Sequence, residues 1–512
     1  MVSHASTRFI LLTLLIALLV QVLVYWPTLH QLPFGDDWGP PLSEINRGER
    51  VGALSFFIET RQPDSYRPMQ SLLMWLFGRV DEPMRWPSIR ALHFLSSGVA
   101  FVVLGLLLRQ WRLGRAGVVI AAAVMALHPS LAAPVGSIDG FSSILSCAAV
   151  WWGVWMMTLA RKRPWLGITL AAVALVVGTL VKEYAFAMTP MAVLAAWFLY
   201  LPRWRSAFIT AFVMGALTVL LLWARRFVKP TDMELPASDF SVDSLNVLVA
   251  NALLVPVGGF FFGDSLWLYV QRDGPAIAVA LLVVAMTMVA LGGGLWRRLR
   301  ALDVQEQHER GTRATVQVAF LLLTIPAITF PANAVMRMSE MYLCGLVFTV
   351  ALLAGLAADG WARDRSRARR CMAIAMAAAL AISSMLAVRH KIRDMVAIGE
   401  RTRFQTNAIL SAAEGLPEGG RIALLYRADQ VPPRATFSSF RLPDCFCVRP
   451  PAADCLPFAR RVVLLAPENP RDRPDAPVHI LPDLPAVQMF DRAKADVVLY
   501  WDVPTSRFVR LK

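Results

Sequence analysis

Two adjacent carboxylates, Asp36 and Asp37, follow the first long apolar run of the chain and lie between Phe34 and Trp38. One of them could act as a general base while the other holds an acceptor or raises the pKa of its partner. The same two side chains could instead bind a divalent cation, because such cations prefer carboxylate oxygens. A solvated loop with an aspartate capping a helix would contain the same dipeptide, so the pair needs support from other residues.

Further polar clusters lie where other apolar runs begin or end. Ionisable groups at the mouth of a membrane span are costly, so each cluster is a candidate for function. Each also has a structural alternative: a snorkelling arginine, a capping histidine, or a Lys–Glu pair that neutralises itself. The clusters are Tyr66-Arg67-Pro68, His128-Pro129 with Asp139-Gly140, Lys182-Glu183, and the segment from Arg337 to Tyr342 that contains Glu340.

The elements that must position these residues are strongly apolar. Of the 512 residues, 56% are hydrophobic and 17% are charged, against about 25% charged in an average soluble domain. This composition excludes a soluble enzyme and a disordered or fibrous protein. The net charge of +15 would suggest nucleic acid in a soluble chain, but here many of the arginines cluster in short segments between apolar runs. We therefore expect membrane lipids and no nucleic acid as partners.

About eleven apolar segments approach the roughly 20 residues that span a bilayer as a helix. The first could also be a signal peptide, but no small-residue cleavage site follows it. The predicted spans are Phe9–Trp26, Ala91–Leu108, Ala116–Ala133, Phe141–Leu159, Trp165–Val181, Ala185–Leu201, Ala207–Trp223, Ile277–Leu295, Val316–Pro331, Tyr342–Ala358 and Met372–Val388.

Basic clusters predict the orientation of these spans. Five arginine-rich segments fall on one side, which the positive-inside rule assigns to the cytoplasm. The N-terminus is then cytoplasmic, and the odd number of spans places the C-terminus outside. Arg225, Arg226 and Lys229 break the rule. They could bind an anion at the outer surface, or they could be a statistical exception. All of the polar clusters described above share this outer face.

Three segments do not span the membrane in this prediction. Residues 29–90 form one external loop, and residues 229–273 form another, whose apolar part is broken by Pro256 and two glycines and suits a re-entrant or interfacial helix. Residues 1–391 form the membrane domain, and residues 392–512 form a small external α/β domain. Its predicted elements are strands at Ile422–Tyr426, Val462–Ala466 and Val497–Trp501 and a helix near Phe404–Ala413.

The six cysteines divide into two groups. Cys147, Cys344 and Cys371 lie in apolar segments and are predicted to be packing residues. Three more lie in the external tail, where an oxidising compartment would allow one disulfide and leave one cysteine unpaired. These are Cys445, Cys447 and Cys455.

The order of the polar clusters resembles the GT-C glycosyltransferases, most of all the bacterial relatives of the protein O-mannosyltransferases and of the TMTC-type mannosyltransferases. The resemblance covers about the first 390 residues. Two departures stand out: Met341 replaces an arginine of the family pattern, with Arg337 one turn earlier as a substitute, and the basic and acidic residues that often follow His-Pro are replaced near Phe141. The motifs are Gly35-Asp36-Asp37-Trp38, Tyr66-Arg67-Pro68, Leu127-His128-Pro129, Val181-Lys182-Glu183 and Ser339-Glu340-Met341-Tyr342-Leu343.

The resemblance implies an all-α polytopic membrane enzyme that moves a sugar from a polyprenyl-phosphate donor to an acceptor at the outer face of the bacterial cytoplasmic membrane. The acceptor could be a glycan, a lipid-linked molecule or a protein. Asp36 would be the catalytic carboxylate and Asp37 would assist it. A divalent cation on the same two residues is the alternative cofactor expectation. Donor-phosphate and substrate binding would fall to Tyr66, Arg67, His128, Lys182, Glu183, Arg225, Arg226, Arg337, Glu340 and Tyr342.

Two other classes of protein compete with a transferase. One is a polytopic lipid or glycan transporter or flippase. Secondary transporters tend to show internal repeats and broken helices near the midplane, whereas here the polar residues gather at one face. The other is a catalytically inactive GT-C relative, which the two motif departures would allow.

Overall fold

The computed structural model describes the chain in segments. The described residues are 4–29, 52–60, 66–137, 140–159, 163–199, 204–225, 229–230, 274–303, 310–334, 340–413, 416–417, 420–427, 462–464, 479–481, 484–489, 495–502 and 507–511.

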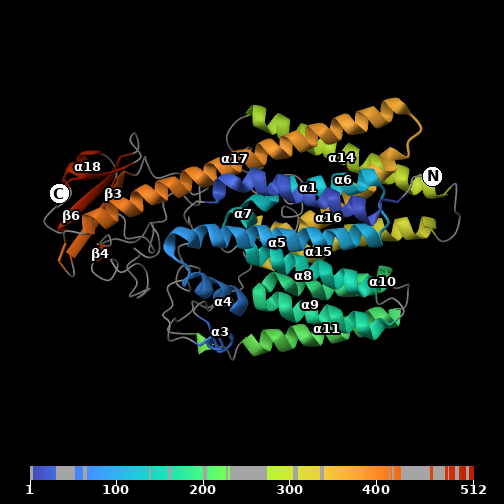
Figure 1. Cartoon of the computed structure of the whole chain (residues 1–512), viewed down its shortest axis with the longest axis horizontal. Helices are drawn as coiled ribbons and strands as arrows, with labels where there is room; N and C mark the ends of the chain where they lie inside the picture. The colour runs from blue at the N-terminus through green and yellow to red at the C-terminus, as the bar shows by residue number, and fades with distance from the viewer. Residues whose placement is uncertain are drawn as a thin grey trace. The chain divides into compact units, whose positions relative to one another are not determined.

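The protein is mainly helical, and the predicted spans lie over helices (Figure 1). Two of them are divided: Ala116–Ala133 covers α6, η3 and the start of α7, and Ala185–Leu201 begins in η5. The helices are α1 (Thr7–Tyr25), η1 (Trp26–Thr28), α3 (Ser55–Ile58), α4 (Pro68–Phe77), α5 (Glu82–Gln110), α6 (Arg115–Leu127), η3 (Pro129–Leu131), α7 (Ala132–Gly136), α8 (Gly140–Leu159), α9 (Pro164–Val181), η5 (Glu183–Ala187), α10 (Met188–Leu199), α11 (Trp204–Arg225), α14 (Gly274–Asp303), α15 (Arg310–Ala334), α16 (Glu340–Ala362), α17 (Arg367–Ala413) and α18 (Leu484–Met489).

Seven helices of the described chain are long and apolar enough to cross a membrane, which indicates a membrane protein. They are α1, α5, α8, α11, α14, α16 and α17. An eighth candidate is α6 taken together with η3 and α7, a pair bent by 45° at its break. The apolar stretches of α9 and α15 are shorter, and α10 has only 12 residues.

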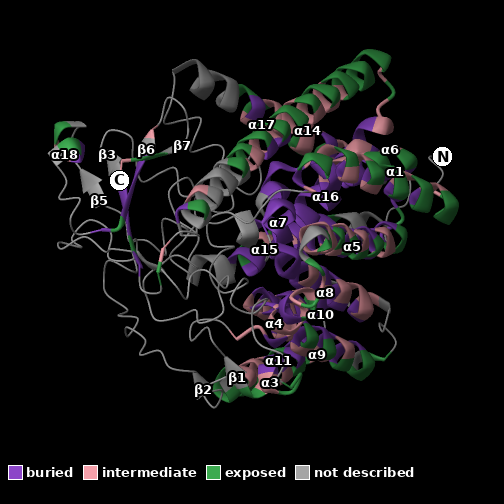
Figure 2. Ribbon diagram, turned by 60° about the vertical axis from the view of Figure 1, so that its left-hand side comes forward, coloured by how far each residue is buried: buried purple, intermediate pink, exposed green. Residues whose placement is uncertain are grey.

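Helix α16 lies at the centre of the bundle, and 94% of its most apolar 18-residue stretch is buried (Figure 2). It packs against α6, α8, α14 and α15. Trp151 of α8 stacks on Phe348 of α16, with 5.8 Å between the ring centroids. The backbones of α6 and α16 also approach closely, since a Cβ on Gly117 would lie 2.6 Å from the carbonyl oxygen of Gly355. Such small residues are typical of membrane helix pairs, where packing replaces the hydrophobic effect.

A buried carboxylate fixes the start of α6 against the end of α16. Asp359 Oδ2 accepts a hydrogen bond from the backbone N–H of Gly114 at 2.6 Å, and Oδ1 accepts one from Gly117 at 2.9 Å. Arg298 of α14 donates to the same carboxylate at 3.1 Å. These bonds satisfy N–H groups that a helix N-terminus leaves without partners. Three helices are thereby joined at the end of the bundle that carries the basic clusters.

Helix α5 begins at Glu82, and its apolar span begins at Met84, earlier than the span start predicted at residue 91. The Arg85 guanidinium donates to the carbonyl oxygens of Gly78 and Val80, just after α4, at 3.2 and 3.3 Å. The carbonyl oxygen of Asp81 also accepts from the N–H of Arg85 at 3.0 Å. These polar contacts start the helix ahead of its apolar part, which hydropathy alone cannot detect. Helix α4 begins at Pro68, a residue type that is favoured at the first helical position.

The chain divides into two compact units. The first contains Met1–Trp26, Phe57–Gln70 and Ala91–Lys391, and the second contains Pro27–Phe56, Ser71–Arg90 and Ile392–Lys512. Helix α17 runs without a break across the predicted domain boundary at residue 392. In the first unit, a short parallel pair joins β1 (Glu59–Thr60) to β2 (Lys229–Pro230).

The tail of the second unit contains a five-stranded mixed sheet. Strand β3 pairs in parallel with β4, β5 and β6, while β7 is antiparallel to β6. Ile422 to Leu425 in β3 are all buried, which is typical of a parallel strand covered on both faces. The sequence predicted β3, β4 and β6 but missed β5, β7 and α18. The strands are β3 (Gly420–Arg427), β4 (Val462–Leu464), β5 (His479–Leu481), β6 (Val497–Asp502) and β7 (Arg507–Arg510).

The cysteines of the helices behave in two ways. Cys147 and Cys344 are buried, as predicted, and their sulfur atoms lie 2.7 Å apart between α8 and α16. Cys371 is exposed in the first turns of α17, so its predicted packing role is wrong. Only 6% of the most apolar 18-residue stretch of α17 is buried, because this helix faces outward rather than into the bundle. The three tail cysteines lie outside the described residues.

Candidate functional site

The structure describes the side chains of five predicted site residues, all in the first unit. They are Tyr66, Arg67, His128, Lys182 and Glu183. Arg225 ends α11, and Glu340 and Tyr342 open α16, but only their backbone is described. The predicted catalytic carboxylates Asp36 and Asp37, together with Arg226 and Arg337, lie outside the described residues. The predicted re-entrant stretch, with its proline and two glycines, also lies outside the described residues.

Arg67 and Glu183 form a bidentate ion pair between two of the motifs. Arg67 Nε donates to Glu183 Oε2 at 2.8 Å, and Nη2 donates to Oε1 at 2.5 Å. The two side chains are 14% and 19% exposed. The local elements explain the placement: Arg67 precedes Pro68, which starts α4, and Glu183 starts the η5 turn between α9 and α10. Arg67, a predicted donor-phosphate or substrate residue, is therefore paired in the structure with a carboxylate of the chain itself.

The charge of Arg67 keeps Glu183 ionised. Burial alone would raise the pKa of the Glu183 carboxyl. The Arg67 guanidinium, through its charge and its hydrogen bonds, and the charge of the neighbouring Lys182 outweigh burial and lower that pKa from 4.5 to about 2. Glu183 is thus an anion at any physiological pH, and it does not suit the role of a proton-transferring group.

Lys182 is a basic residue in an almost fully buried position. Its side chain is 2% exposed, and Nζ donates to Ser143 Oγ at 2.8 Å. Ser146 donates its hydroxyl to the backbone carbonyl of Lys182 at 3.1 Å, which satisfies an oxygen left over at the end of α9. A buried lysine at the end of an apolar helix is costly and marks a functional candidate.

A continuous set of contacts extends from this lysine to α16. The backbone oxygen of Ser143 lies 3.5 Å from Cys344 Sγ, near the start of α16. Trp151 Nε1 donates to the carbonyl oxygen of Gly345 at 3.2 Å. Gly345 has no room for a side chain, because an added Cβ would fall on the Tyr184 hydroxyl. The Lys182-Glu183 motif therefore adjoins the helix that begins with the Glu340–Tyr342 motif.

His128 has a structural role in this arrangement. Its side chain is 6% exposed, and Nδ1 accepts a hydrogen bond from the backbone N–H of Ser130 at 3.2 Å, which caps η3. This is the capping role that the sequence left open beside a functional one. Lys391 of α17 also reaches this turn, donating from Nζ to the carbonyl oxygen of Pro129 at 3.3 Å. The turn packs against α16 through η3.

The structure brings together the Tyr-Arg-Pro and Lys-Glu motifs by direct contact, and it links both to α16. Tyr66 is held by a hydrogen bond from its hydroxyl to the carbonyl oxygen of Phe57 at 2.9 Å. Arg67, Lys182 and Glu183 thus gather charged side chains from both motifs at one place.

Sequence reasoning missed three polar residues near these motifs. Ser143 holds Lys182, and a serine at a helix start gives no distinctive signal. His93 is fully buried and its Nε2 lies 2.5 Å from the carbonyl oxygen of Ser137. Lys391 is the last residue of the predicted membrane domain, just beyond the last predicted span, where a basic residue gives no distinctive signal. Within the described residues, no group of three or more His, Cys, Asp or Glu could hold a metal ion.

No family model matches the chain, and no curated protein matches it at a significant level. The function proposed below therefore rests on the residues and their contacts.

Proposed function

We propose that the protein is a membrane glycosyltransferase of the GT-C type, which moves a sugar from a polyprenyl-phosphate donor to an acceptor at the outer face of the bacterial cytoplasmic membrane. The observation that carries this proposal is the contact between Arg67 and Glu183. It joins two motifs that are 116 residues apart in the chain and places a second cation, Lys182, beside them. The acceptor is a glycan, a lipid-linked molecule or a protein.

The proposed reaction assigns a task to each charge. Asp36 takes the proton from the acceptor hydroxyl while the acceptor oxygen forms a bond to the anomeric carbon of the sugar. The bond between that carbon and the phosphate oxygen breaks, and polyprenyl phosphate leaves with the bonding electrons. Asp37 positions the acceptor. Cations near the leaving phosphate stabilise its developing negative charge.

The described contacts sharpen the roles of the cations. The charge of Arg67 is compensated by Glu183, so in this proposal the two residues are a positioning pair that holds the start of α4 against η5. Lys182 lies beside this pair and is a candidate for stabilising the leaving phosphate. Arg225, Arg226 and Arg337 remain candidates for direct phosphate contacts, and Tyr66, His128, Glu340 and Tyr342 remain candidates for substrate contacts.

The proposal requires all catalytic motifs to share the outer face. Eleven spans, a cytoplasmic N-terminus and a periplasmic segment after residue 392 meet this requirement. A reporter enzyme that is active only outside the cytoplasm, fused after Lys512, should be active. Activity of a strictly cytoplasmic reporter at the same position would contradict the span count and, with it, the shared face of the motifs.

A comparison of envelope glycans tests the function in the cell. Cells that lack this protein should lose one glycan modification, and the wild-type gene should restore it. An Asp36→Asn gene should fail to restore it, while an Asp81→Asn gene should succeed, because the Asp81 contact that the structure shows is made by its backbone carbonyl. An unchanged glycan profile in the deletion strain would contradict the proposed function.

A further inference from the structure

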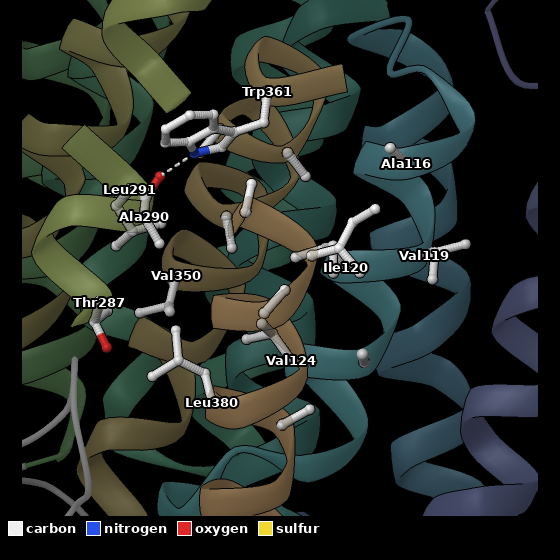
Figure 3. A pocket seen from close by; sticks show the side chains of 18 of the residues that line it. Ala116, Val119, Ile120, Val124, Thr287, Ala290, Leu291, Val350, Trp361 and Leu380 are labelled. Atoms are coloured by element: carbon white, nitrogen blue, oxygen red, sulfur yellow. Dashed lines mark hydrogen bonds between the residues drawn. The ribbon is translucent and has the colours of Figure 1, made fainter. Parts of the chain in front are cut away.

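An apolar groove of about 600 Å³ lies between α6, α14, α16 and α17 (Figure 3). Its walls are aliphatic and small, as at Ile120, Val350, Ala377 and Leu380. None of the described residues that line it carries a carboxylate. Its volume lies within the range of about 300–1,000 Å³ that is typical of sites for small ligands. It is separate from the cluster of Arg67, Lys182 and Glu183, none of which lines it.

The outer wall of the groove is a helix with little other packing. Only 6% of the most apolar 18-residue stretch of α17 is buried, whereas 94% of the corresponding stretch of α16, on the opposite wall, is buried. The close-up shows Leu380 from this helix pointing toward Val350 across the groove. A membrane helix that stands off from its bundle leaves space that lipid chains fill, because neither water nor vacuum is favourable there.

The polar residues of the lining are divided between the two ends. One end of the groove lies near Trp361, in the last turn of α16, and is lined by two arginines. These are Arg115, the first residue of α6, and Arg370, in the first turns of α17. His128 and Ser384 lie toward the other end. Both arginines are exposed, and neither has a carboxylate partner among the described residues.

The two arginines are the charged residues of the described lining at this end of the groove. Each lies at or near a helix N-terminus, where Asp359 at α6 and Asp364 at α17 already accept from backbone N–H groups. Arg115 is held over the ring of Phe9, with 5.6 Å from Cζ to the ring centroid, which does not neutralise it. A phosphate at this end of the groove would be a suitable hydrogen-bonding partner for both guanidinium groups.

The length of the groove fits one lipid of one leaflet. Helix α6 from Arg115 to His128 rises about 20 Å at 1.5 Å per residue. One leaflet, with its headgroup region, is about half of a 40–45 Å bilayer. The charge lies at one end of this length and the apolar wall occupies the rest.

We propose that the groove is a binding site for an anionic glycerophospholipid, whose acyl chain lies between α6 and α17 and whose phosphate is held by Arg115 and Arg370. Basic pockets between helices at the cytoplasmic end of a membrane protein recognise such headgroups. The bound lipid fills the space between α17 and the bundle. The site stands independently of the proposed transferase activity.

Native mass spectrometry of the purified, delipidated full chain tests the site directly. Phosphatidylglycerol and phosphatidylcholine with the same palmitoyl and oleoyl chains are titrated separately. Each arginine near an anionic headgroup contributes roughly fivefold, so the first bound phosphatidylglycerol should be favoured by about 25-fold. A phosphatidylglycerol with a photoreactive group in its chain should form adducts within residues 116–127 and 373–384.

Matched variants separate the headgroup from the groove. Arg115→Gln with Arg370→Gln should remove the headgroup preference, whereas Arg367→Gln, on the same helix but outside the lining, should change it less than twofold. Ala377→Phe fills the groove and should abolish the adducts, whereas Ala375→Phe, on the exposed face of the same helix, should keep them. Size-exclusion profiles and helical circular dichroism confirm that each variant is folded.

Three results would overturn the proposal. The first is equal binding of the two phospholipids by the wild-type protein. The second is an undiminished preference for phosphatidylglycerol in the double arginine variant. The third is a spread of adducts over all exposed helices, which indicates ordinary annular lipid.

Discussion

Removal of the Glu183 carboxylate should destabilise the protein by about 3 kcal/mol. Burial raises the pKa of this carboxyl, but Arg67 lowers it from 4.5 to about 2. At 1.36 kcal/mol per pKa unit, this difference corresponds to about 3 kcal/mol in favour of the ionised form. The value agrees with the roughly 3–5 kcal/mol lost when one partner of a buried ion pair is removed. The side chain is 19% exposed, so little of this is screened by solvent.

A double-mutant cycle measures the interaction without the other effects of each substitution. The free energy of unfolding is measured by titration with SDS in mixed micelles for wild type, Glu183→Gln, Arg67→Gln and the double variant. We expect a coupling energy of about 2–3 kcal/mol. Arg79→Gln is the control, because this exposed arginine lies over Trp75 at 3.6 Å and should cost less than about 1 kcal/mol. A coupling energy below about 0.5 kcal/mol would refute the pairing of Arg67 with Glu183.

Three further outcomes follow from the described contacts. Because the pKa of Glu183 is lowered on folding, its contribution to the free energy of unfolding should be fully present above about pH 4.5 and should be lost as the pH falls toward 2. A difference in unfolding free energy between wild type and Glu183→Gln that already declines between pH 7 and 5 would contradict this expectation. Asp359→Asn should cost about 3–5 kcal/mol in the same titration, because it leaves a buried guanidinium without its carboxylate, and a cost below 1 kcal/mol would contradict that role. A maleimide should modify Cys371 and leave Cys147 and Cys344 intact until SDS unfolds the chain, as peptide mapping would show.

The helices could be predicted because membrane spans depend on composition over long windows. The predicted spans lie over helices, although the span predicted at Ala116–Ala133 is broken at His128. The start of α5 was set too late, because the hydrogen bonds of Arg85 that begin this helix carry no hydropathy signal. The exposure of Cys371 was missed for a related reason, since an apolar residue that faces lipid looks the same in sequence as one that faces protein.

The candidate site was predicted residue by residue but not as an arrangement. Arg67 and Glu183 were both singled out, yet their mutual contact depends on how α4 and η5 pack, and pattern alone cannot supply it. Lys182 was noted as a cation, but Ser143, which holds it, has no signal in the sequence. The pair of Asp359 and Arg298 was also missed, because each residue looks like an ordinary charge near the end of a helix.

The most direct measurement of the central claim is the transfer rate of a purified Asp36→Asn protein with a polyprenyl-phosphate-linked sugar. Wild type should transfer the sugar, and Asp36→Asn, which keeps the size of the side chain but removes the proton acceptor, should be slower by a factor of about 10² to 10⁴. Asp81→Asn, purified in the same way, should retain the wild-type rate. Full activity of a normally inserted Asp36→Asn protein would contradict the catalytic assignment, and lipid transport by a wild-type protein without sugar transfer would contradict the proposed function itself.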